Sequence, residues 1–156
     1  MKDSYKDLVC WDENNDEYYI DYPIGNQTLH MGFQVTGPND DFHKDITYFN
    51  IWINLYNKRK DQLRNEDLHL STGLNPIKTV LVARECFEAI VDTIIDDMQD
   101  NETDVVIYAH WVDNRRRDAY YRILKKYGYK YGYVPVEKTK VIMKKYKWND
   151  YYEYEE

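Results

Sequence analysis

The sequence predicts an α/β domain built around a mixed β-sheet, and three observations support this fold class. The 156 residues are long enough for one domain to bury a substantial core. Apolar residues alternate in a strand-like way over the first third of the chain, whereas residues 67–129 read as strand, helix, strand and helix. A last pair of strand-like segments follows this central β-α-β-α unit.

The chain is expected to contain one domain, over residues 18–147, flanked by two acidic ends. Residues 1–17 are polar and acidic, and we expect them to form an arm that Trp11 docks. Residues 148–156 form a tail that is rich in tyrosine and glutamate and is expected to be mobile or to lie on a partner.

Three strands are predicted before the central unit. Residues 18–22 are expected to form a short strand that ends at Pro23, and Gly25 begins a turn. Alternation predicts a half-buried strand over residues 29–35 and a further strand over residues 46–56. In the latter, Phe49, Ile51, Ile53 and Leu55 should share one face, and Tyr48, Trp52 and Tyr56 the other.

The central unit is expected to place two parallel strands side by side. A strand-helix-strand unit forms a right-handed crossover, and its two strands are then parallel neighbours. The strands at 67–72 and 105–111 should therefore lie side by side, with a helix from Pro76 packed across them. The second strand is apolar on both sides, which predicts helices on both faces of the sheet. Asp113 can cap a second helix, which should stop at Gly128.

Strands at 129–136 and 139–145 are expected to complete the sheet. In the second of them, Val141 and Met143 should face one way and Ile142 the other. The predicted order of elements is therefore β-β-β-α-β-α-β-β.

Composition indicates a cytoplasmic protein, in the host cytoplasm if the source is viral. Cys10 and Cys86 are too few for a disulfide framework, which favours a reducing compartment. No apolar run approaches the roughly 18 residues that span a bilayer, and no apolar region follows the N-terminus as it would in a signal peptide. We therefore expect no membrane association.

Charge is unevenly distributed along the chain, whose net charge is −7. Residues 113–147 carry +9 and the remainder carries −16. Such a dipolar chain can receive an anionic ligand on its C-terminal third, while the acidic remainder argues against a nucleic acid partner. The four histidines lack the spacing of metal ligands, so no metal site is predicted.

Residues 114–129, Asn-Arg-Arg-Arg-Asp-Ala-Tyr-Tyr-Arg-Ile-Leu-Lys-Lys-Tyr-Gly-Tyr, resemble the penultimate helix of the GNAT superfamily of N-acetyltransferases. In that helix, Asn, Ala and Tyr precede a Gly-aromatic pair, and the superfamily core has the same order of elements. The spacing of Tyr120 to Gly128, and Arg116 four residues before Tyr120, are closer to divergent members found in tailed phages. The resemblance covers residues 68–141 and implies a GNAT-like fold and acyl-CoA-dependent N-acyl transfer to a small-molecule or protein amine.

Two residues are candidates for catalysis. Tyr120 resembles the tyrosine that protonates the departing CoA thiolate, and Tyr121 would replace it if the helix register differs by one. His110, at the end of a predicted strand, could take a proton from the amine. The alternatives are a core aromatic on an amphipathic helix for Tyr120 and a solvated strand-end residue for His110.

Acetyl-CoA or another acyl-CoA is the implied cofactor, held at residues 73–80. GNAT members carry Arg/Gln-x-x-Gly-x-Gly/Ala there, whose glycines let backbone N–H groups approach the pyrophosphate. This chain departs from that pattern, because Pro76 removes a donor and Ile77 adds a side chain. The candidate cofactor contacts are Leu74, Asn75, Lys78, Thr79 and Arg116.

The glycine-poor segment leaves a second class of function open. A protein with this fold that does not bind the cofactor would be a binding protein, either a virion component or an inhibitor of a host factor, for which tyrosine and tryptophan are good interface anchors. A third alternative is nucleic acid binding through the basic residues 115–147. Within this range, Arg115, Arg116 and Arg117 could equally form a solvated run of charges.

Overall fold

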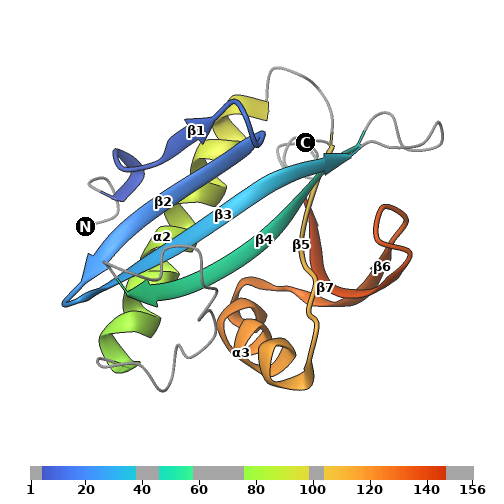
Figure 1. Ribbon diagram of the computed structural model, residues 1–156. Coiled ribbons are helices and arrows are strands. Elements are labelled where there is room, and N and C mark those ends of the chain that lie inside the picture. The colour runs from blue at the N-terminus through green and yellow to red at the C-terminus, as the bar shows by residue number, and fades with distance from the viewer. Residues whose placement is uncertain (1–4, 38–45, 58–75, 99–103, 147–156) are drawn as a thin grey trace, which may run out of the picture.

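The computed structural model describes residues 5–37, 46–57, 76–98 and 104–146, which form a seven-stranded mixed sheet with two α-helices (Figure 1). The predicted α/β class and mixed sheet are therefore confirmed. The sheet order is β1-β2-β3-β4-β5-β7-β6, and only β4 and β5 are parallel within it. The elements are β1 (Cys10–Asp12), β2 (Glu17–Ile24), β3 (Gln27–Gly37), β4 (Ile46–Asn57), α2 (Pro76–Met98), β5 (Asp104–Ala109), α3 (Asn114–Leu124), the 3-10 helix η3 (Lys125–Tyr127), β6 (Lys130–Val134) and β7 (Thr139–Tyr146).

The parallel neighbour of β5 differs from the one that the sequence suggested. β5 pairs with β4 on one edge and with β7 on the other, so both of its edges are occupied. The expected neighbour, the strand at 67–72, lies outside the described residues. The crossover unit is therefore β4-α2-β5-α3. The prediction was wrong because strand pairing depends on contacts between distant segments, whereas the sequence pattern indicated only the strand-like segment that precedes β5 most closely in the chain.

The strand β2 extends past Pro23, where the sequence predicted its end. In the β2–β3 hairpin, Ile24 faces Gln27 across a two-residue turn, and Gly25 takes the positive φ of 61° that such turns require. Pro23 is one residue further from the turn, where antiparallel pairing points the N–H away from the partner strand. β1 pairs only with residues 17–19, so the missing N–H of Pro23 costs no ladder hydrogen bond.

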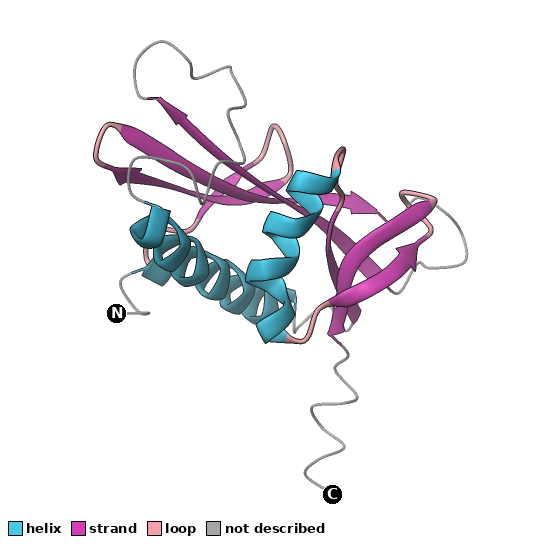
Figure 2. Cartoon of the chain, turned by 90° about the horizontal axis from the view of Figure 1, so that it is seen from below, coloured by secondary structure: helices cyan, strands magenta, loops and turns pink. Residues whose placement is uncertain are grey.

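Apolar residues form two clusters on opposite faces of the sheet. The larger cluster joins α2 and α3 to strand residues such as Ile20, Met31 and Ile53, and Figure 2 shows the longer helix on one side of the strands. The smaller cluster comes from strands on the other face and consists of Ile46, Tyr48, Val106, Tyr108, Val134 and Val141. The predicted faces of β4 and β7 are thus confirmed. Both described helices contribute to the larger cluster, so helices on both faces stay a prediction.

The ends of α3 follow the local signals in the sequence. Asp113 is its N-cap, and the carboxylate accepts a hydrogen bond of 2.8 Å from the backbone N–H of Arg116. The last turn tightens into η3, after which Gly128 has a φ of 93°, a value that favours glycine. The predicted start and stop of this helix are confirmed.

The N-terminal segment is docked on the sheet. β1 forms an edge strand against β2, and the predicted boundary at residue 17 falls on the first residue of β2. Trp11 packs on Tyr18 with ring centres 4.8 Å apart, and Tyr5 stacks on Tyr22 at 5.1 Å. The tail at 148–156 lies outside the described residues. Among the described helices, none is long and apolar enough to cross a membrane.

Candidate functional site

The two parallel strands part partway along β4. Their pairing runs from Ile46 opposite Asp104 to Ile51 opposite Ala109. Beyond that point β4 continues beside β3, as far as Asn57 opposite Gln27, while β5 ends and the chain turns into α3 (Figure 1). The carboxyl ends of neighbouring parallel strands are a common location for ligands. The place where β4 and β5 part is therefore the first candidate site.

The predicted cofactor contacts before and within the first turn of α2 differ in their exposure to solvent. Leu74 and Asn75 lie outside the described residues. Lys78, in the first turn of α2, is exposed and can reach an anion near the helix N-terminus, whereas Thr79 is fully buried and its hydroxyl is closed to solvent. Ile77 is 78% exposed, so its side chain does not fill the space beneath the helix.

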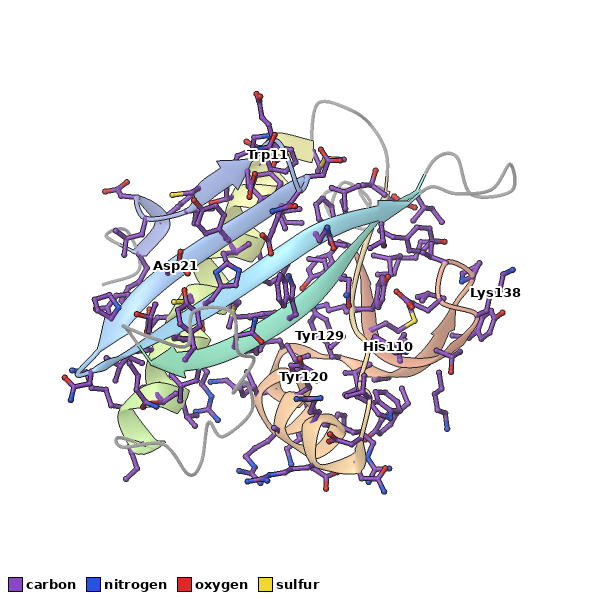
Figure 3. All side chains as sticks on the ribbon, in the orientation of Figure 1. Trp11, Asp21, His110, Tyr120, Tyr129 and Lys138 are labelled. Atoms are coloured by element: carbon purple, nitrogen blue, oxygen red, sulfur yellow. The ribbon has the colours of Figure 1, made fainter. Side chains whose placement is uncertain are left out.

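The two candidate tyrosines point in different directions from α3. Tyr120 is 4% exposed and belongs to the larger core cluster, with its ring on the sheet side of the helix (Figure 3). Tyr121 is half-buried and stacks on Tyr131 of β6 at 5.0 Å. Of the two, Tyr120 is the one directed toward the sheet core. Its role as an acid stays a prediction.

His110 directly follows the last residue of β5 and is half-buried at the strand end (Figure 3). Its side chain forms no hydrogen bond or ion pair with the described residues. A catalytic histidine usually has its tautomer set by a partner on the second ring nitrogen. In the described residues, no hydrogen bond or ion pair of this kind orients the ring of His110.

The basic start of α3 is partly screened by its own acids. Arg116 is half-buried, and its Nη1 lies 3.5 Å from Oδ2 of Asp113, the residue that also caps the helix. Arg117 Nε lies 3.1 Å from Oδ1 of Asp118. Asp113 therefore offsets the unfavourable placement of cations at a helix N-terminus.

The structure brings together a polar cluster that the sequence analysis did not single out. On the face of β2–β4 opposite the helices, Glu17 is only 3% exposed. Its Oε2 accepts a hydrogen bond of 2.6 Å from Nε1 of Trp52 and lies 3.5 Å from Nε2 of His30. Nδ1 of His30 lies 2.6 Å from Oδ1 of Asp21, the residue directly opposite it across β2 and β3. Three adjacent strands are thus joined by side-chain contacts.

Glycine makes room for the buried carboxylate of this cluster. A Cβ on Gly32 would overlap Oε2 of Glu17 and would approach Nε1 of Trp52 to 2.9 Å. Any larger residue would therefore displace the bonded pair. The close approach of a side chain to the backbone explains why glycine stands in the middle of a long strand, where it otherwise weakens a sheet.

The charge of His30 is set by opposing effects. Burial disfavours the imidazolium and lowers its pKa, but the hydrogen bonds and negative charges of Asp21 and Glu17 outweigh burial and raise the pKa of His30 to about 9. His30 is therefore a cation at neutral pH, between two carboxylates. The available sequence signal was the polar alternation of β2, β3 and β4, but alternation gives no register, and so it cannot pair Asp21 with His30.

A second buried polar group links β5 to the β6–β7 turn. The hydroxyl of Tyr108 donates to Oε2 of Glu137 at 2.6 Å and lies 2.9 Å from Oγ1 of Thr36. Burial and the neighbouring Glu137 raise the pKa of Tyr108 above its usual value. Tyr108 therefore stays protonated and acts as a hydrogen-bond donor near the parallel pair.

These observations define two candidate regions: the point where β4 and β5 part, just before the chain enters α3, and the polar cluster on the other face of β2–β4. Comparisons of the chain with protein-family models, curated proteins and solved structures found no match.

Proposed function

We propose that the protein is an acyl-CoA-dependent N-acyltransferase-like protein with a GNAT-like fold, or a catalytically degenerate form of one. The observation that supports this proposal best is the parting of the parallel strands after Ile51 and Ala109, with a helix following each strand. A thioester would lie between the parted strands, where no described strand pairs with β4 in place of β5 and backbone N–H groups could stabilise the oxyanion of a tetrahedral intermediate.

Four of the candidate residues have separate roles in this proposal. The amine would attack the thioester carbonyl carbon and lose a proton to His110, and the carbon–sulfur bond would break as Tyr120 protonates the thiolate. Lys78 and the first turn of α2 would face the pyrophosphate, because helix N-termini favour anions. Arg116 would face the 3′-phosphate, in competition with Asp113.

The GNAT-like arrangement of the fold is part of the same proposal. It rests on the succession β4-α2-β5-α3-β6-β7 and on the sheet order, in which the C-terminal hairpin continues the sheet beyond β5. A GNAT-like arrangement also includes helices on both faces. An experimental structure that describes residues 58–75 would test it directly.

Isothermal titration with acetyl-CoA is the first test, with coenzyme A as the second ligand. We expect a saturable heat, and an affinity about fivefold or more lower in Lys78→Met, since one phosphate contact is lost. Lys126→Met removes an exposed cation from η3 and is the matched control. No heat at about 100 µM ligand, a concentration at which a micromolar site saturates, would remove the enzymatic proposal.

If acetyl-CoA binds, the catalytic roles are tested by acetyl transfer to a panel of amines. Tyr120→Phe should lower kcat by about 100-fold or less, as expected for loss of a general acid, with little effect on KM. Tyr121→Phe is the control, because that ring faces β6. Equal rates for the two variants would exclude Tyr120 as the acid.

The second candidate is a non-enzymatic binding protein, a virion component or an inhibitor of a host factor on the same scaffold. It is favoured by exposed apolar side chains in the C-terminal part of the chain, where Tyr133 of β6 is 61% exposed and Val112, in the loop before α3, is 69% exposed. Tyrosines of this kind anchor interfaces. Affinity capture from the natural host should recover a partner that Tyr133→Ser loses and that Trp11→Ser, at the opposite edge of the sheet, retains. Equal capture by both variants would count against this surface.

A further inference from the structure

A pocket of about 290 Å³ lies between α2 and β7. It is distinct from the parting of β4 and β5, because its residue Tyr146 pairs with Val105 near the start of β5, whereas the strands part at Ala109. The volume is at the lower end of the range for pockets that bind small organic molecules, about 300–1,000 Å³. Its lining consists of Phe87, Glu88, Val91, Asp92, Tyr127, Lys144 and Tyr146.

The ammonium group of Lys144 is held in place at this pocket. Its Nζ donates a hydrogen bond of 2.7 Å to the carbonyl oxygen of Tyr127 and lies 4.9 Å from the ring centre of Tyr146. The side chain also runs along Gly128, where a Cβ would come within 3.4 Å of Nζ. The backbone of η3 and the ring of Tyr146 thus fix this half-buried cation.

Lys144 forms no ion pair with a carboxylate of the described residues. Burying a cation without an anion is unfavourable, and the single hydrogen bond to Tyr127 leaves two further N–H donors of the ammonium. A ligand with a carboxylate would supply the missing anion. The position of Lys144 therefore selects for an anionic group at the β7 side of the pocket.

The α2 side of the pocket has the opposite charge. Glu88 and Asp92 are one helical turn apart and so project from the same side of α2. The hydroxyl of Tyr127 donates to Oε2 of Glu88 at 2.7 Å and orients that carboxylate. Asp92 is exposed and forms no hydrogen bond or ion pair with the described residues. This side selects for a cationic group.

We propose that this pocket binds a small zwitterion with an apolar part, of the class of α-amino acids with apolar side chains. The ligand carboxylate meets Lys144, its ammonium meets Glu88 and Asp92, and its side chain packs on Val91, beside the almost fully buried Phe87. Opposite charges on two sides of one small pocket give this specificity. The site is independent of the proposed acyl transfer.

The test uses the full chain and three probes that differ by one charged group. L-Phenylalanine carries both groups, 3-phenylpropionate lacks the ammonium, and phenethylamine lacks the carboxylate. Backbone amide NMR titration should show saturable shifts at Gly128 and Lys144 with L-phenylalanine. The other two probes should bind about tenfold or more weakly, since each loses one charge-assisted contact.

Variants separate this site from unspecific binding. Lys144→Met should weaken L-phenylalanine about tenfold or more, whereas Lys145→Met, which removes the neighbouring cation that lies near Asp104 on the other face, should leave it unchanged. Asp92→Asn, at an exposed position that tolerates substitution, should weaken L-phenylalanine but not 3-phenylpropionate. The proposal is overturned if no probe shifts these amides at millimolar concentration, if 3-phenylpropionate binds as tightly as L-phenylalanine, or if Asp92→Asn has no effect.

Discussion

The two faces of β2, β3 and β4 are stabilised in different ways. On the face toward α2, Ile20, Met31 and Ile53 are buried side by side, and their contribution scales with the apolar area removed from water. On the other face, Glu17 and His30 are held by hydrogen bonds and charges. The same three strands therefore combine a non-directional core with a directional polar cluster.

The difference between the faces lies in how each responds to change. An apolar core tolerates substitutions that conserve volume and is insensitive to pH. A buried carboxylate beside an imidazolium depends on each hydrogen-bond partner and on the charge of the histidine. Perturbing one face at a time should separate these contributions.

The largest expected effect comes from opening a cavity on the helix face. Phe87 is fully enclosed between α2 and the sheet and contacts the rings of Phe33, Tyr127 and Tyr129. Phe87→Ala should lower the free energy of unfolding by about 3–5 kcal/mol. Urea denaturation measures this loss. Leu81→Ala, on the same helix but 55% exposed, should change stability by less than about 0.5 kcal/mol. Similar losses for the two variants would mean that the helix face is not the main core.

The next effect is a pH dependence that belongs to the polar face. The pKa of His30 is raised from 6.5 to about 9 in the folded protein, so its stabilising contribution is complete below pH 6.5 and is lost as pH rises through 9. Stability should fall by about 2–3 kcal/mol across this window. His30→Gln should remove this dependence, while Phe87→Ala should keep it. A flat stability profile of the wild type between these pH values would show that Asp21 and Glu17 do not stabilise the imidazolium.

The smallest expected effect is loss of one hydrogen bond within the same cluster. Trp52→Phe keeps an aromatic ring beside His30, whose ring centre is 5.3 Å away, but removes the donor to Oε2 of Glu17. Stability, measured by urea denaturation, should fall by about 1.5–2 kcal/mol, the lower part of the range for a hydrogen bond to a charged group. Trp11→Phe is the control at an exposed site. If Trp52→Phe costs no stability once Glu17→Met has removed the acceptor, the hydrogen bond is the cause; if the two effects simply add, the loss comes from packing.

Local patterns predicted most elements of the fold. Alternation identified the buried faces of β4 and β7, and the capping signals at Asp113 and Gly128 located α3 and η3. These features depend on side chains within a few residues of each other. The prediction of the parallel partner of β5 was wrong, because the true partner, β4, is separated from β5 in the chain by α2 and a long intervening segment.

For the candidate sites too, the sequence identified individual residues, and the tertiary structure decided their surroundings. The sequence identified Tyr120 and Lys78 as candidates, and the structure adds that one ring faces the core and the other side chain faces solvent. The sequence could not identify Lys144 as a cation without a carboxylate partner in the described part of the chain, because Tyr127, Gly128 and Tyr146 surround it only after β7 returns to the sheet.

The sequence by itself determined the type of most elements, their apolar faces and the ends of α3, since each depends on the spacing of near neighbours. Only the tertiary structure decided that β4 lies beside β5 and that Asp21 lies opposite His30. Strand register and sheet order arise from contacts between segments far apart in the chain, and the local periodicity of the sequence does not specify them.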